Sequence, residues 1–191
     1  MGIKTSNEIT VRIAVSKEEF IEFLKKSGFE EKERFSLDDY YLIPKDLDLG
    51  KISEREILAK AVIIRNISEN SGYKKKITFK VKNINPSGEI ISQEAINCDI
   101  YDKDEAIRLF EAIGYYEIMN IKENDIVYGK DNFEIAVKYL PNKTLIEIET
   151  DDNFDTIEKL KEEVIRLNFP IDTSNFFVKK AEEQLREMLQ E

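Results

Sequence analysis

The stretch KKKITFKVKN, residues 74–83, alternates polar and apolar side chains with the two-residue period of a β-strand. One strand face would carry Lys76, Thr78, Lys80 and Lys82, and the opposite face would carry Ile77, Phe79 and Val81. The chain as a whole has a net charge of −10, so a row of lysines on one face is unexpected. This strand therefore raises the question of which anion these lysines face.

The composition indicates one well-filled domain over residues 1–191. Hydrophobic residues make up 41% of the chain and charged residues 36%, which is typical of a globular protein with a charged surface. No apolar run approaches the roughly 18–20 residues that span a bilayer, and no signal-peptide core is present. We therefore expect a cytoplasmic protein that does not bind membranes. A pI of about 4.8 argues against a general nucleic-acid-binding surface.

The chain contains no histidine and a single cysteine, Cys98. The missing histidine excludes Ser–His and Cys–His catalysis as well as histidine ligands for a metal. A bound metal would therefore be a hard cation held by carboxylates, such as Mg²⁺ or Mn²⁺. Cys98 alternates with Ile96 and Ile100, so we expect it to pack on an apolar strand face.

Two segments of the chain repeat one pattern. Ser16 and Asp102 are predicted helix N-caps with a glutamate three positions later, and Gly28 and Gly114 end the two helices at the same spacing. Strands with tight turns follow each helix, residues 44–57 are expected to form a polar loop, and two further helices are predicted at about 154–167 and 174–190. We interpret the repeat as a duplicated α+β unit.

Several predicted strands oppose an apolar face to a charged face, whose members are Glu8, Arg12, Arg65, Lys76, Lys80, Lys82, Glu147 and Glu149. For any single strand, the charged face could simply point to solvent. If helices cover the apolar side of a closed sheet, however, the charged faces line its interior. We therefore predict an α+β fold: a closed or nearly closed antiparallel β-barrel of about eight strands, with helices packed outside. The mixed charges suit a polyanion together with a metal ion.

Five short segments, in order along almost the whole chain, resemble the motifs of the CYTH family of triphosphate tunnel enzymes. This family includes class IV adenylate cyclases and thiamine triphosphatases. The matching segments are EITVR with Glu8 and Arg12, DDYY at residues 38–41, VIIR with Arg65, ITFK with Lys80, and LIEIE with Glu147 and Glu149. The resemblance implies a barrel whose interior forms a tunnel that binds triphosphate with a divalent metal ion.

The chain departs from the family pattern mainly at acidic and arginine positions. The departures are Thr10 in the opening motif, Ile63 for the first arginine of a pair, Gln93, Ala95, Asn97 and Asp99 in a strand of alternating glutamates, Asn124 for an arginine beside Lys122, and Val137 or Lys138 for an acidic residue. The resemblance therefore supports the architecture more strongly than it supports full catalytic competence.

The resemblance also implies roles for the charged residues that are retained. Phosphate oxygens would be bound by Arg12, Arg65, Lys76, Lys80, Lys82 and Lys122. A magnesium or manganese ion would be held by Glu8, Glu147 and Glu149, and these three glutamates with Lys80 would form the catalytic set. Alternatively, Glu147 and Glu149 could pair with Lys80 and Arg65 across the sheet, without any role in binding.

These residues favour metal-dependent hydrolysis of inorganic or small organic triphosphates. Within the enzyme class, formation of cyclic AMP by a class IV adenylate cyclase is the rival reaction. A second class is a weakened tunnel that binds triphosphate, polyphosphate or a nucleotide without turnover, and a third is a barrel that serves only protein contacts. A homodimer is left open as an assembly.

Overall fold

The computed structural model describes residues 8–84, 90–131, 133–140, 143–150, 156–176 and 179–190. The elements in chain order are β1 (Glu8–Arg12), α1 (Lys17–Lys26), β2 (Glu30–Pro44), α2 (Glu54–Ala59), β3 (Val62–Glu69), β4 (Gly72–Ile84), β5 (Ile90–Asp99), α3 (Lys103–Ala112), β6 (Tyr115–Lys130), β7 (Phe133–Leu140), β8 (Lys143–Thr150), α4 (Ile157–Arg166) and α5 (Lys180–Gln190).

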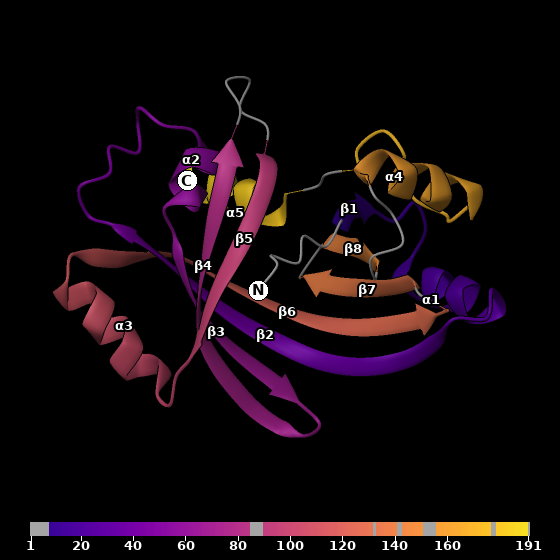
Figure 1. Cartoon of the computed structure of the whole chain (residues 1–191), viewed down its shortest axis with the longest axis horizontal. Coiled ribbons are helices and arrows are strands. Elements are labelled where there is room, and N and C mark those ends of the chain that lie inside the picture. The colour runs from indigo at the N-terminus through magenta and orange to yellow at the C-terminus, as the bar shows by residue number, and fades with distance from the viewer. Residues whose placement is uncertain are drawn as a thin grey trace. The chain divides into compact units, whose positions relative to one another are not determined.

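The strands form one eight-stranded sheet in the order β1-β8-β7-β6-β2-β3-β4-β5 (Figure 1). The β1–β8, β3–β4, β4–β5, β6–β7 and β7–β8 pairs are antiparallel. The predicted α+β class and the eight antiparallel strands are therefore confirmed. In the part of the chain that the structure describes, β1 and β5 are the two ends of this order, so hydrogen bonds do not join them into a closed ring.

The chain divides into two compact units, which we describe separately. Of the described residues, unit 1 contains 36–122 and 180–190, and unit 2 contains 8–35 and 123–176 together with 179. The long strands β2 and β6 each contribute one part to unit 1 and the other part to unit 2. A single functional domain over residues 1–191 stays a prediction.

Unit 2 is built on an apolar core between its strands and two helices. The buried side chains of this core include Val11, Phe20, Ile135, Ile146, Leu160 and Val164, which come from β1, α1, β7, β8 and α4. Four phenylalanines meet there, because the ring of Phe169 lies 5.9–6.3 Å from the rings of Phe20, Phe23 and Phe29. This core fixes one face of β6, β7 and β8, and it leaves the other face to polar residues.

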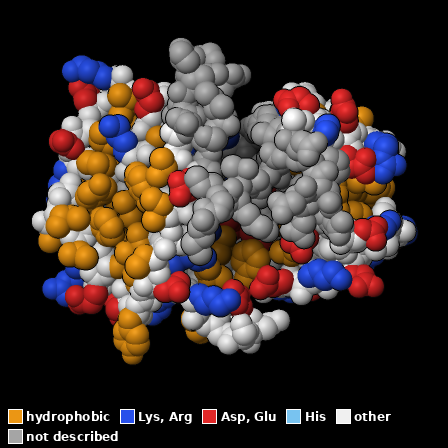
Figure 2. Space-filling view, viewed as in Figure 1, with side chains coloured by type: hydrophobic (Ala, Val, Ile, Leu, Met, Phe, Trp, Pro, Cys, Tyr) orange, Lys and Arg blue, Asp and Glu red, His pale blue; other side chains and the backbone are white. Residues whose placement is uncertain are grey.

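Unit 1 carries α3 against one face of its strands. Leu42, Ile64 and Ala106 are buried there, and Phe110 packs edge-on against Tyr115 at 5.4 Å. At another place in this unit, α2 and α5 are tied by two ion pairs, Arg55–Glu182 and Arg186–Glu54, each with a nearest distance of 2.9 Å. Hydrophobic side chains gather on the surface of this unit (Figure 2), and the exposed ones include Val81, Ile96, Leu109 and Ile113.

The predicted repeat is confirmed in local detail. Ser16 caps α1 with a complete capping box, and Asp102 caps α3 by accepting hydrogen bonds from the amides of Asp104 and Glu105. Gly28 and Gly114 follow the helices with φ angles of 84° and 97°, a region that favours glycine. Each helix is then followed by a long strand, β2 with 15 residues and β6 with 16.

Some local expectations differ from the structure. The expected loop at 44–57 contains the start of α2, which Ser53 caps through a capping box with Glu56. The last helix begins at Lys180, later than the expected 174. Cys98 is exposed on β5 instead of packed. Ile96, two residues earlier on the same strand face, is 53% exposed as well. None of the described helices is long and apolar enough to cross a membrane.

Candidate functional site

A lysine surrounded by carboxylates lies in the sheet of unit 2. The Nζ atom of Lys138 lies 2.9 Å from Glu147, 3.2 Å from Asp125 and 3.7 Å from Glu123. The Lys138 side chain is 10% exposed, and those of Glu123 and Asp125 are at most 1% exposed. The site therefore combines a buried ammonium group with three acidic neighbours.

Strand register explains why these four side chains meet. On β6, Asp125 stands directly opposite Lys138, and Glu123 is two residues away on the same face. On the other side of β7, Leu145 of β8 stands opposite Lys138, and Glu147 is its diagonal neighbour. Lys138 thus occupies the middle strand of three and reaches carboxylates on both of its neighbours.

The charge state of Lys138 follows from this environment. Burial by itself lowers the pKa of a lysine, because it disfavours the charged form. Here the negative charges of Glu147, Glu123 and Asp125 outweigh burial, and the pKa of Lys138 is raised above its ordinary value. Lys138 is therefore expected to carry its positive charge at neutral pH.

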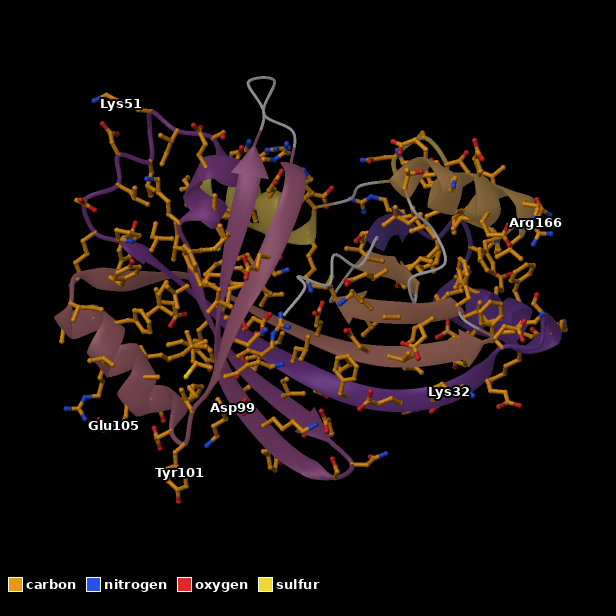
Figure 3. All side chains as sticks on the ribbon, viewed as in Figure 1. Lys32, Lys51, Asp99, Tyr101, Glu105 and Arg166 are labelled. Carbon is orange, nitrogen blue, oxygen red and sulfur yellow. The ribbon has the colours of Figure 1, made fainter. Side chains whose placement is uncertain are left out.

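A cavity of about 230 Å³ opens beside this lysine. Its lining residues all belong to unit 2: Lys32, Glu33, Phe35, Val127, Glu134, Ala136, Lys138 and Glu147. Figure 3 shows Lys32 on the half of β2 that belongs to this unit. Its side chain crosses Gly129, where an added Cβ would approach the Lys32 Cε to 2.9 Å. The absence of a side chain at Gly129 therefore makes room for the Lys32 side chain, which borders the cavity.

A second charged face lies in unit 1, on the strand that carries the lysine row. In β3 and β4, Arg65 stands opposite Lys76, and Ile63 stands opposite Thr78. The Arg65 guanidinium donates two hydrogen bonds to the buried Asp39 carboxylate, at 2.7 and 2.6 Å. The Asp39 carboxylate thus stabilises the positive charge of Arg65, which would otherwise repel Lys76 on the neighbouring strand.

Lys80 and Lys82 continue this face toward the end of β4. Lys76, Lys80 and Lys82 are half-buried, whereas Thr78 is 3% exposed and donates a hydrogen bond to Asn97 at 2.8 Å. Among the described residues, no hydrogen bond or ion pair is found for Lys80. The lysine face predicted from the alternation in β4 is therefore present, and Lys80 is a half-buried member of it.

The DDYY segment divides its polar groups between the two faces of β2. Asp39 binds Arg65, while Asp38 accepts hydrogen bonds from the Tyr40 hydroxyl at 3.0 Å and the Asn120 amide at 2.7 Å. Tyr40 also lies under the Lys103 ammonium group, 4.3 Å from its ring centre. These residues thus brace strand positions within unit 1.

The predicted site residues fall into the two units. Unit 1 holds Arg65, Lys76, Lys80, Lys82 and Lys122, and unit 2 holds Glu8, Arg12, Glu147 and Glu149. Lys122 is exposed, Arg12 is half-buried, and strand register pairs Glu8 with Glu149 and Thr10 with Glu147. The side chains of Glu8 and Glu149 lie outside the described residues, so the roles predicted for them stay predictions.

The residues around Glu147 do not fit a divalent metal ion in this structure. The carboxylate of Glu147 lies against the Lys138 ammonium group at 2.9 Å, and a cation cannot share that space. Across the described ranges, no group of three or more acidic, histidine or cysteine side chains is arranged to hold a metal. Metal binding by Glu8, Glu147 and Glu149 stays a prediction.

Sequence reasoning missed Glu123 and Asp125 and left Lys138 without a role. The segment KEND, residues 122–125, is polar at every position, so its alternation cannot tell which pair points inward. The buried pair is Glu123 and Asp125, and Lys122 and Asn124 are exposed. The alternation of buried Ile121 and Met119 before this segment was the available signal.

No protein-family model and no curated protein matches the chain. Solved structures do: the PH1819 protein from Pyrococcus horikoshii is 19% identical with a TM-score of 0.71, over 95% of this chain and 99% of that one. A candidate adenylate cyclase from Vibrio parahaemolyticus is 15% identical with a TM-score of 0.65, over the whole of both chains.

A third solved structure, HpAC1 from Hippeastrum, is 13% identical with a TM-score of 0.59 and covers 95% of each chain. It is described as a candidate adenylyl cyclase with a dominant triphosphatase activity. At these identities the likeness shows a shared fold. The fold is therefore one that occurs in candidate adenylate cyclases and in a protein with triphosphatase activity.

Proposed function

We propose that this protein binds a triphosphate-containing small molecule or polyphosphate through the lysine face of β4, without efficient turnover. The observation that carries this proposal is the position of Lys80, half-buried on a strand face with Lys76 and Lys82 and without an ion pair among the described residues. A half-buried cation in such a row is more favourable when an anion neutralises it.

The strand geometry suits an extended polyanion. Side chains on one strand face repeat at about 7 Å, so Lys80 and Lys82 can reach neighbouring phosphate groups of one chain. Arg65 is held in place by Asp39, which pre-orients its guanidinium group at the edge of the same face. Binding would then rest on charge-assisted hydrogen bonds from several cations.

Metal-dependent hydrolysis of a triphosphate is the second candidate, and the similarity to HpAC1 favours it. The prediction from the sequence assigns its Mg²⁺ or Mn²⁺ to Glu8, Glu147 and Glu149. Cyclic AMP formation is the corresponding cyclase reaction, which the similarity to the Vibrio protein favours. We also propose a cytoplasmic location, as expected from the sequence.

Thermal unfolding with tripolyphosphate tests the binding proposal. We expect tripolyphosphate to raise the unfolding midpoint in EDTA as well as in Mg²⁺ or Mn²⁺, because the lysine face needs no metal. Lys80→Ala should remove most of the shift. Lys51→Ala, which makes the same charge change at an exposed position of unit 1 (Figure 3), should keep it. An equal shift in both variants would contradict the proposal.

Product assays separate binding from the two reactions. Phosphate release and cyclic AMP formation are measured with ATP and tripolyphosphate, in Mg²⁺ and in Mn²⁺. The binding proposal predicts neither product above background under conditions where the thermal shift is saturated. Release of phosphate at a rate that Lys80→Ala reduces would establish the hydrolase instead.

A further inference from the structure

The three carboxylates of unit 2 are arranged around one point, and Lys138 Nζ occupies that point. Glu147, Asp125 and Glu123 approach it from two neighbouring strands, at 2.9, 3.2 and 3.7 Å. Counted as whole residues, Glu123 and Asp125 are 3% and 1% exposed. Buried carboxylates are costly unless a cation neutralises them, so the cation at this point holds the group together.

The backbone around this point is fixed by the core on the opposite side of the sheet. Val137, next to Lys138, and Ile146, next to Glu147, are completely buried in the apolar core of unit 2. Ile126, next to Asp125, is 7% exposed in the same core. The side chains that face Lys138 therefore start from strand positions that cannot separate far, even if the lysine were absent.

A divalent cation would need the same place as the ammonium group. As they stand around Lys138, the three carboxylates are not placed to hold a metal. Mg²⁺ takes carboxylate oxygens at about 2.1 Å, so those of Glu147 and Asp125 would have to move inward by about 1 Å and that of Glu123 by about 1.6 Å. The ammonium group supplies three hydrogen-bond donors at the longer distances that are observed. The two kinds of cation are thus alternatives for one set of ligands.

We propose that Lys138 takes the place of a divalent cation in unit 2, so that Glu123, Asp125 and Glu147 bind a metal ion only when Lys138 is removed. The lysine is a resident cation, supplied by the chain itself and fixed by strand register. Glu123, Asp125 and Glu147 therefore already contact a cation without any metal ion. This inference does not depend on the proposed binding of triphosphate in unit 1.

Titration with Mn²⁺ alone tests the proposal, with free Mn²⁺ counted by electron paramagnetic resonance. In the wild-type protein we expect no Mn²⁺ site that depends on Glu147. Glu147→Gln should therefore leave the Mn²⁺ binding of the otherwise wild-type protein unchanged. Lys138→Met, which keeps much of the side-chain volume but not the charge, should bind Mn²⁺ at least about tenfold more tightly than the wild type. The double variant Lys138→Met, Glu147→Gln should lose this gain.

Lys32→Met is the matched control, because Lys32 lines the same cavity but is 49% exposed and does not contact the three carboxylates in the described pairs. It should bind Mn²⁺ no better than the wild type, and so should the charge-preserving Lys138→Arg. If Lys138→Met is unfolded in EDTA, circular dichroism with added Mn²⁺ is the readout. Recovery of the folded signal supports the proposal.

Three results would overturn the inference. The first is Mn²⁺ binding to the wild-type protein that Glu147→Gln abolishes, since a metal would then bind beside Lys138. The second is equal Mn²⁺ affinity of Lys138→Met and the wild type. The third is an unfolded Lys138→Met that Mn²⁺ does not refold.

Discussion

Lys138 on β7 and Glu147 on β8 form an ion pair of 2.9 Å inside the sheet of unit 2. The pair joins neighbouring strands at diagonal register positions, and Asp125 on the third strand completes the arrangement at 3.2 Å. Lys138 thus offsets part of the negative charge of three carboxylates, of which Glu123 and Asp125 are buried. The stability of unit 2 should therefore depend on the charge of Lys138.

Lys138→Met should lower the free energy of unfolding by about 3–5 kcal/mol at pH 7, because it removes the ammonium group that contacts the buried carboxylates of Glu123 and Asp125. Urea unfolding followed by circular dichroism measures it, in EDTA to exclude metal binding. Lys32→Met should cost less than about 1 kcal/mol, and an equal cost for both variants would contradict the account.

Arg65→Lys should lower the free energy of unfolding by about 1–3 kcal/mol, since lysine cannot make the two hydrogen bonds to the buried Asp39. Arg34→Lys is the matched control, because Arg34 also forks onto one carboxylate, that of Glu31, but is 56% exposed. We expect less than about 1 kcal/mol there. Similar losses at the two positions, measured by urea unfolding, would show that the burial of Asp39 is unimportant.

Gly114→Ala should destabilise the protein through backbone strain alone. Gly114 has a φ of 97°, yet an added Cβ would meet no atom within 4 Å. The expected cost is about 1–2 kcal/mol, which is the cost of the left-handed conformation for a residue with a side chain. Gly50→Ala provides the comparison, because no left-handed φ is found there. Thermal unfolding that treats both variants alike would argue against the helix-ending role of Gly114.

Glu117→Gln should stabilise the protein at neutral pH. Glu117 is exposed overall, but partial desolvation by its neighbours raises its pKa above the ordinary value of 4.5; Lys103 opposes this, and Asp38 and Glu111 add to it. The unfolded chain therefore releases this proton first, and stability is lost as the pH rises from 4.5 through the folded-state pKa. Glutamine carries no charge and avoids this loss.

The unfolding midpoint of Glu117→Gln should thus exceed that of the wild type at pH 7, with a smaller difference near pH 4.5. Glu94→Gln, at an exposed position of β5, controls for the change in net charge. A midpoint difference that stays constant between these pH values would contradict the assigned pKa direction.

Local signals in the sequence predicted much of the fold. Ser16 and Asp102 had the spacing of helix caps, Gly28 and Gly114 ended the helices, and the alternation around Lys80 predicted the strand that became β4. These features depend on residues a few positions apart. Ser53 and Glu56 carried the same capping signal for α2, which was overlooked in a segment that looked polar.

The charged cluster of unit 2 could not be predicted in the same way. Lys138 meets Asp125 and Glu147 only because three strands adopt one particular register. A shift of one residue would turn each of these side chains to the other face. In the polar segment around Glu123 both faces look alike, so only the preceding Met119 and Ile121 pointed to the face on which Glu123 and Asp125 are buried.

Isothermal titration of tripolyphosphate into the wild-type protein in EDTA, repeated with Lys80→Ala and Lys51→Ala, tests the central claim most directly. The account predicts saturable binding that weakens at higher salt, is lost in Lys80→Ala and is retained in Lys51→Ala. The absence of binding to the wild type, or equal affinity of Lys80→Ala and the wild type, would contradict it.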